Sequence, residues 1–337
     1  MIGVSALKGA NDALIRKAGI GWVREDIPFP FAGAVGGPTT GAYRSAKEDI
    51  SRWAARGLKV LGVTPLPGIG TREKASDGTW TMKWTPWIPE WAGKPGSAEY
   101  MKTYEATCAF LAADLRNKVP AWQIMNELDI AQFAGPLNPK QACDLITAAA
   151  RGLKSADPSL VVGHNPAGAA EAYFFFGRLF GIPDRIVDYC GIDGYYGSWA
   201  SGGPEKWAGR IDELSRLTGA PILVNEWGFA SRGGVQTEEE RKSGQPSCGF
   251  KKWPHTWGDG HTAETQARFV KECYEVFRAR KSDLLGAFFY RWEDQETCWQ
   301  CSSPDCPCET AWGLVDLNGD PKPAYHEFRE GVRLLKS

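Results

Sequence analysis

Short apolar runs recur along the whole chain. Each run is continuous or nearly so, which is typical of parallel strands that other elements cover on both faces. The eight strands predicted from these runs are Ile2–Leu7, Gly21–Ile27, Leu58–Thr64, Ala121–Met125, Leu160–Gly163, Ile186–Ile192, Pro221–Asn225 and Leu284–Arg291.

Segments with the period of an amphipathic helix lie between these runs. In residues 139–155, for example, Ala142, Ile146 and Ala149 recur on one face, behind a predicted N-cap at Asn138. The other predicted helices are residues 10–18, 44–56, 98–117, 170–181 and 324–335, one around Trp207–Leu217, and one behind Thr262 around Phe269–Phe277.

Strand and helix therefore alternate eight times, and this order predicts a (β/α)8 barrel, or TIM barrel. A doubly wound open sheet is the alternative, but it usually has fewer strands, and no glycine-rich phosphate loop follows the first strand here. A length of 337 residues fits one barrel with long loops, so we expect residues 1–337 to form a single domain.

Three connections are too long for plain turns, and each follows a predicted strand. They cover roughly residues 28–43, 66–97 and 229–261. The loops on this side of a barrel form its active-site face. Disordered loops are poor in tryptophan, so the tryptophans of these loops predict ordered walls; they are Trp80, Trp84, Trp87, Trp91, Trp253 and Trp257.

Composition narrows the classes of partner. The net charge is −1, so no basic field favours nucleic acid. No apolar run reaches the ~18 residues that span a bilayer. We therefore expect neither nucleic acid nor a membrane as partner. Strand-like sequence follows Met1 directly, so no signal peptide is visible.

Two predicted strands end in the pair Asn-Glu, the fourth at Glu127 and the seventh at Glu226. Such positions face the mouth of a barrel, and strands 4 and 7 lie nearly opposite in a ring of eight. Retaining glycosidases use two carboxyl groups about 5–5.5 Å apart. Two close carboxylates also split their pKa values, so that one stays protonated. The structural alternative is a pair of surface residues, or a buried ion pair with Arg24.

This arrangement resembles the clan A retaining glycoside hydrolases, along essentially the whole barrel. The resemblance rests first on Asn-Glu at strand 4 and Glu at strand 7. It implies that Glu127 is the acid/base and Glu226 the nucleophile. It also implies that Asn126 hydrogen-bonds the 2-hydroxyl of the sugar.

Further strand-end residues extend the resemblance. Arg24 matches the arginine that holds the nucleophile ionised, and Trp292 matches the tryptophan platform beneath the sugar. Asp193-Gly-Tyr195 resembles a His-x-Tyr element whose tyrosine contacts the nucleophile. Asp193 stands where histidine is more usual, so the sugar contacts at this position stay open.

Tryptophan rings offer wide apolar platforms for sugars. We expect Trp84 and Trp87 to bind substrate, and several such subsites favour an endo-acting enzyme. For either tryptophan, pinning its loop to the barrel is an equally good role. His164, after the fifth strand, is expected either to line the site or to be a satisfied core histidine.

The chain contains nine cysteines, and four of them follow the eighth strand: Cys298, Cys301, Cys306 and Cys308. Disulfides that staple this loop are the favoured interpretation, and they predict an oxidising compartment. A structural zinc site is the alternative, because Cys-x2-Cys is a metal spacing. The second pair, Cys-x-Cys, is tighter than usual for zinc. Cys248 lies in the loop after the seventh strand.

We therefore expect a retaining glycosidase that acts on a β-linked oligo- or polysaccharide. We also expect no cofactor or catalytic metal, a monomer, and a secreted or extracytoplasmic location. A non-catalytic carbohydrate-binding barrel and a transglycosylase remain alternatives on the same cleft. A metal-dependent lyase or isomerase is a third, but Asp26 and Asp193 make no ligand set with the two glutamates.

Overall fold

Eight parallel strands close into a barrel in the computed structural model, which describes residues 1–5, 11–181 and 185–337. Their order around the barrel is β1-β12-β9-β8-β7-β6-β3-β2, and β1 pairs with both β2 and β12. This confirms the predicted (β/α)8 fold and its eight strands. The strands are β1 (Ile2–Ser5), β2 (Trp22–Asp26), β3 (Lys59–Val63), β6 (Ala121–Gln123), β7 (Val161–His164), β8 (Tyr189–Gly194), β9 (Ile222–Trp227) and β12 (Leu284–Phe289).

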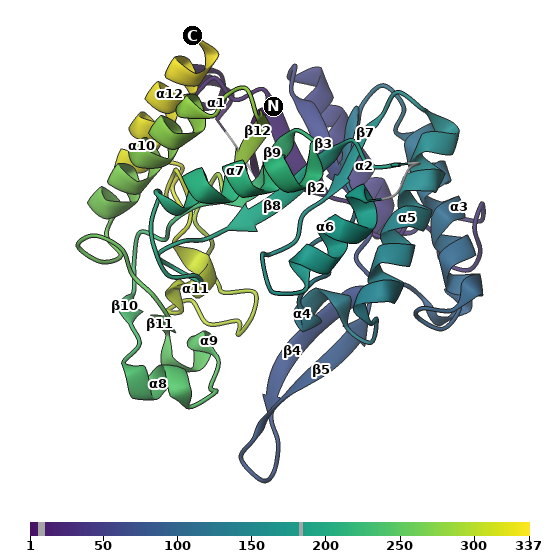
Figure 1. Cartoon of the computed structure of the whole chain (residues 1–337), viewed down its shortest axis with the longest axis horizontal. Helices are drawn as coiled ribbons and strands as arrows, with labels where there is room; N and C mark the ends of the chain where they lie inside the picture. The colour runs from purple at the N-terminus through teal and green to yellow at the C-terminus, as the bar shows by residue number, and fades with distance from the viewer. Residues whose placement is uncertain (6–10, 182–184) are drawn as a thin grey trace.

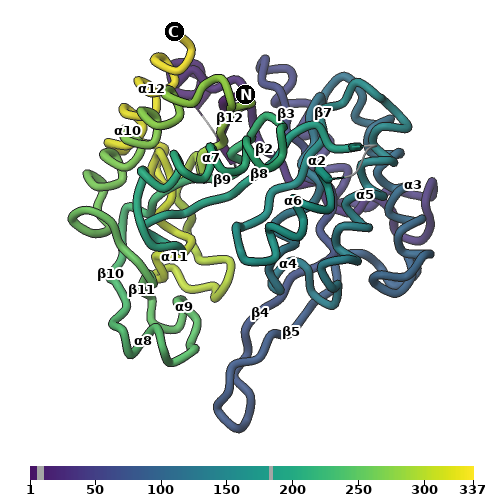
Figure 2. Tube along the Cα trace, viewed as in Figure 1, coloured from purple at the N-terminus to yellow at the C-terminus, as the bar shows by residue number. Residues whose placement is uncertain are grey.

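Helices surround the barrel, as Figure 1 shows and as the trace in Figure 2 lets the reader follow. The Asn138 side chain caps α5 as predicted, in a capping box with Gln141, and Thr262 caps α10. Residues 6–7 and 10, at the ends of the first predicted strand and helix, lie outside the described residues. The long helices are α1 (Asp12–Lys17), α2 (Gly41–Ala55), α3 (Ala98–Asp114), α5 (Pro139–Ala156), α6 (Ala172–Phe180), α7 (Lys206–Thr218), α10 (Ala263–Ala279) and α12 (Pro323–Lys336).

Large side chains fill the barrel interior. One layer consists of the buried residues Leu61, Ala121, Tyr189, Leu223 and Phe288. Glycines make room for the two rings: a Cβ added at Gly3 would lie 2.5 Å from the Phe288 ring, and one at Gly163 would lie 2.5 Å from the Tyr189 ring. The interior is thus a packed core, and the open site is left to the ends of the strands.

The three long connections after β2, β3 and β9 extend from the same end of the barrel. The second was predicted as a loop but contains an antiparallel hairpin, which projects from the molecule while both termini lie at the opposite end (Figure 1). No described helix is both long and apolar enough to cross a membrane. The short elements are β4 (Gly68–Lys74), β5 (Trp80–Pro86), η1 (Glu90–Ala92), α4 (Ala131–Ala134), β10 (Gly234–Val235), α8 (Glu238–Lys242), α9 (Ser247–Phe250), β11 (Lys252–Trp253) and α11 (Pro307–Thr310).

Candidate active site

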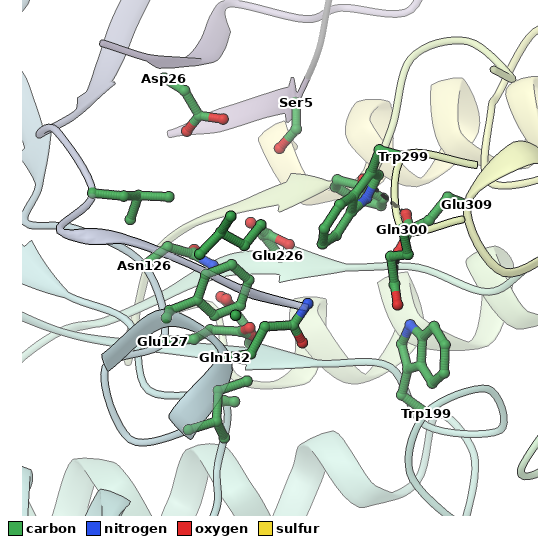
Figure 3. A pocket seen from close by; sticks show the side chains of 18 of the residues that line it. Ser5, Asp26, Asn126, Glu127, Gln132, Trp199, Glu226, Trp299, Gln300 and Glu309 are labelled. Carbon is green, nitrogen blue, oxygen red and sulfur yellow. Dashed lines mark hydrogen bonds between the residues drawn. The ribbon is translucent and has the colours of Figure 1, made fainter. Parts of the chain in front are cut away.

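A cleft of about 2060 Å³ opens at the carboxyl ends of the strands. Both predicted carboxylates line it, Glu127 just after β6 and Glu226 on β9. Figure 3 shows their side chains in the same cavity, with Asn126 beside them and with Trp199 and Trp299 also lining it. The cleft also receives residues from the hairpin and from the loops after β9 and β12.

Glu226 has a cation and a hydroxyl as partners. The Arg24 guanidinium lies 2.8 Å from its Oε1, and the Tyr195 hydroxyl donates a hydrogen bond to its Oε2. Burial raises the pKa of Glu226 above its ordinary value, although Arg24 and Tyr195 act against this rise and favour the carboxylate. Burial alone would lower the pKa of Arg24, but the Glu226 carboxylate and its neighbours raise it, so the guanidinium stays charged beside Glu226.

Glu127 has a different environment. Its backbone has a φ of 45°, in the left-handed region, and Met125 two residues earlier has a φ of 56°. These two conformations turn the chain sharply at the end of β6. Burial and the negative charges of Glu226 and Asp129 raise the pKa of Glu127 well above its ordinary value. Its acid form therefore persists at pH values where an exposed glutamate is ionised.

Asn126 is oriented by three donors to its Oδ1. Arg24 donates at 2.8 Å, Asn165 at 2.8 Å and Gln123 at 3.1 Å. With the oxygen saturated, the amide nitrogen is left for a partner in the cleft, which Asn126 lines. The amide can thus act as a donor to a substrate hydroxyl.

Asp193 lies at the end of β8, in contact with the Glu127 side chain. Asn165 donates to its Oδ2 at 2.6 Å, whereas its buried Oδ1 receives no hydrogen bond from the described residues. Burial and the charges of Glu226 and Glu127 raise the pKa of Asp193 well above its ordinary value. A proton shared between the Asp193 and Glu127 carboxyl groups would satisfy the open oxygen.

Three of the predicted site residues, His164, Trp292 and Trp84, do not line the cleft. His164 is buried, donates from Nδ1 to the Ile124 carbonyl at 2.7 Å, and stacks on Phe175, so it is a core histidine. Burial lowers its pKa to about 4. Trp292 is 2% exposed and packs edge-on against Tyr325. That position is incompatible with a platform for sugar.

The two predicted tryptophans of the second loop differ in position. Trp84 packs over Gly135, where an added Cβ would lie 2.4 Å from its ring, and it pins the hairpin to the loop after α4. Trp87 is 50% exposed and lines the cleft. Only Trp87 is placed to meet a substrate.

The structure adds lining residues that the sequence did not single out as site residues. Tyr290 directly follows β12 and occupies the cleft in place of Trp292, because the strand ends two residues earlier than predicted. Glu309 accepts hydrogen bonds from Tyr290 at 3.2 Å and Gln300 at 2.7 Å. Burial raises the pKa of Glu309 to about 7. The added aromatic walls are Trp299 and Trp312, and Trp199 also lines the cleft.

The predicted disulfides are not present. All nine cysteines lie within the described residues, and all are free. The Sγ atoms of Cys248 and Cys298 are 3.7 Å apart, whereas a disulfide joins sulfurs about 2.05 Å apart.

Comparison with known proteins bears on the fold. No family model and no curated protein matches the sequence. Among solved structures, a glucosidase from Croceicoccus marinus aligns over 99% of this chain and 67% of that chain, with a TM-score of 0.67 and 14% identity. A β-glucuronidase 2 from Bacteroides uniformis, covalently bound to cyclophellitol-6-carboxylate aziridine, aligns over 99% and 35%, with a TM-score of 0.61 and 16% identity.

A GH2 β-galacturonidase from Eisenbergiella tayi, bound to galacturonate, aligns over 95% of this chain and 46% of that chain. Its TM-score is 0.56 and its identity is 16%. This chain thus spans between about a third and two thirds of the length of these three proteins. At such low identity the likeness shows a shared barrel fold.

Proposed function

We propose that this protein is a retaining glycoside hydrolase that cleaves β-linked glycosidic bonds by double displacement. The observation that carries this proposal is a carboxyl pair with unequal environments in one cleft. Arg24 and Tyr195 counteract the effect of burial on the pKa of Glu226, whereas burial and nearby negative charge together favour the protonated form of Glu127. These unequal environments suit Glu226 to the role of nucleophile and Glu127 to the role of acid. The glycosidases of similar fold support this assignment.

The proposed reaction has two steps. In the first, a Glu226 oxygen attacks the anomeric carbon while the bond to the leaving oxygen breaks and Glu127 gives that oxygen its proton. In the second, water attacks the anomeric carbon, gives a proton to Glu127, and releases Glu226 as a carboxylate. Asn126 holds the 2-hydroxyl through its free amide donor. The anomeric configuration is retained because it is inverted twice.

The shape of the cleft supports an extended substrate. Exposed Trp87 and Trp299 and half-buried Trp199 line the same cleft as the two glutamates (Figure 3 shows Trp199 and Trp299). Each indole can stack on a sugar ring. We infer an oligo- or polysaccharide substrate and endo action. Transfer of the glycosyl group to a sugar instead of water uses the same residues and would be seen as longer products.

The test combines substitutions with a covalent probe. We expect Glu226→Ala to lower kcat on aryl β-glycosides by a factor on the order of 10⁴ or more. We expect Glu127→Ala to lower turnover by about 10²–10⁴-fold, and least on substrates whose leaving group needs no proton. The substrate panel should include glucosides, glucuronides and galacturonides, followed by polysaccharides. NMR of the first-formed anomer reports retention.

A matched control is the variant Glu25→Gln. The Glu25 carboxyl lines the same cleft and accepts a hydrogen bond from Trp53 at 3.3 Å. The variant should keep most of the activity. A cyclophellitol aziridine should label the wild type on the peptide that contains Glu226, and should not label Glu226→Ala. Near wild-type turnover by both alanine variants would refute the proposal. A protein that binds oligosaccharides but cleaves none would be the non-catalytic barrel.

A further inference from the structure

Five cysteine side chains gather beside the cleft from two loops that are far apart in sequence. Cys248 lies in α9, in the loop after β9, and the others lie after β12, where α11 contacts α9. The Sγ atoms of four of them all lie within 4.8 Å of one another: Cys248, Cys298, Cys301 and Cys306. The fifth, Cys308, has its thiol beside those of Cys248 and Cys306.

The spacing of the sulfurs distinguishes a metal from a disulfide. The Sγ atoms of Cys248 and Cys298 are 3.7 Å apart, far beyond the bond length of about 2.05 Å. Four sulfurs at about 2.3 Å from a tetrahedral zinc ion lie about 3.8 Å from one another. The observed distance therefore matches two ligands of one metal ion.

Backbone N–H groups lie beside two of the cluster's sulfurs. Those of Gln300 and Cys301 face the Cys298 sulfur, and that of Cys308 faces the Cys306 sulfur. Such N–H groups orient metal ligands. The pair Cys298 and Cys301 has the Cys-x2-Cys spacing of zinc sites.

We propose that this cluster binds one structural zinc ion through four thiolates, those of Cys248, Cys298, Cys301 and Cys306. With four protein ligands the site is closed and has no position for substrate. The tight spacing of Cys306 and Cys308 is no obstacle, because the fourth ligand is Cys248 in another loop. Cys308 directs its thiol to the Lys252 carbonyl at 3.9 Å and stays outside the ligand set.

The metal would hold one wall of the cleft in place. Trp312 donates to the Cys308 carbonyl at 2.8 Å and packs on Tyr195 with ring centroids 5.0 Å apart. Tyr195 in turn donates to Glu226. Two cleft residues, Trp299 and Gln300, lie between the ligands Cys298 and Cys301. Joining the two loops through zinc would thus fix the side chains of this wall.

The first measurement is the metal content of the full chain, purified without added metal. We expect one zinc per chain by mass spectrometry of the elements. Cys248→Ser and Cys298→Ser should lose most of it, and the matched control Cys143→Ala, a buried thiol in α5, should keep it. If the serine variants fail to fold, the wild-type protein can be tested instead. p-Hydroxymercuribenzoate should release one zinc ion per chain, measured with a chelating dye.

The other outcomes overturn the proposal. The first is a protein without metal, all nine of whose thiols react when it is unfolded. The second is a protein mass two hydrogens lower than that of the reduced chain, which shows a disulfide. The third is a site filled by iron. Cys308→Ser should keep zinc and Cys301→Ser should lose affinity. The reverse result would overturn the ligand set stated here. None of these readouts depends on glycosidase activity.

Discussion

At the scale of single residues, Asp193 shares the titration of the proposed acid, Glu127. Activity requires protonated Glu127, so it falls as pH rises through the pKa of Glu127, which burial and nearby charge place well above its ordinary value. The Asp193 carboxyl contacts Glu127, so the two titrate together. The alkaline limb of the pH profile therefore belongs to the pair.

We expect Asp193→Asn to move this alkaline limb to lower pH by about one unit. Once the pair has lost both protons, Asp193 is a like charge beside Glu127. Asparagine removes that charge, so Glu127 ionises more easily. The amide oxygen can still accept the bond from Asn165, and the amide nitrogen can donate to the Glu127 carboxylate, which acts in the same direction. The measurement is kcat/KM against pH on an aryl β-glycoside. An unmoved limb, or one moved to higher pH, would show that the two carboxyls do not share a proton.

At the scale of elements, the hairpin β4–β5 forms part of the cleft wall through Arg72, Trp80 and Met82. Arg72 and Met82 are register partners. Replacing residues 73–81 by Asn-Gly, which favours a two-residue turn, would shorten the hairpin and leave the rest of its ladder intact. It removes Trp80 and spares Trp87.

We expect the shortened variant to fold and to keep its activity on aryl monoglycosides. On long oligosaccharides kcat/KM should fall about tenfold, because losing one aromatic platform costs about 1 kcal/mol or slightly more. Chromatography of the products reports whether cleavage still occurs within the chain. An equal loss on both kinds of substrate would mean that the hairpin supports the catalytic centre and not a distant subsite.

The elements differ in how far the sequence predicts them. The barrel strands were predictable because burial on both faces makes them continuous apolar runs, as in β9. The hairpin was missed because most of its residues are exposed and carry no such run. A signal was available, since Asp77-Gly78 between two β-prone segments favours a tight turn.

The residues of the site also divide into those that the sequence predicted and those that it missed. Glu127 and Glu226 were predictable because the strand order alone brings their strand ends to one mouth. Trp299 and Glu309 were not, since their loop takes its path from contacts such as Gln300 with Glu309 and from the cysteine cluster. The error at Trp292 was one of register, with Tyr290 the aromatic side chain in the cleft.

At the scale of the whole molecule, the expected extracytoplasmic location rested on disulfides. The nine free cysteines remove that support, and a thiolate zinc site is compatible with a reducing compartment. Location, like the single domain and the monomer, stays a prediction. The barrel core gives a firmer basis for prediction, because its packing joins all eight strands.

Gly163 on β7 pairs in register with Tyr189 on β8, and an added Cβ would lie 2.5 Å from the Tyr189 ring. The ring cannot retreat freely, since its hydroxyl donates to the Trp122 carbonyl at 3.1 Å inside the barrel. We expect Gly163→Ala to cost about 1–3 kcal/mol by overpacking and to lower the Tm by about 2–8 °C. The thermal unfolding of the purified variant measures this.

The matched control is Gly209→Ala in the exposed part of α7, where an added Cβ meets nothing within 4 Å. Alanine there should stabilise the helix by up to about 1 kcal/mol, so the same substitution should have opposite signs at the two sites. A wild-type Tm for Gly163→Ala would mean that the interior layer yields at little cost. The Tyr189 hydroxyl also lies 3.4 Å from the Asn225 amide, and Asn225 donates to Gln123. Gln123 in turn orients Arg24 and Asn126. A shift of Tyr189 would therefore reach the proposed catalytic pair, and kcat would change although Tm did not.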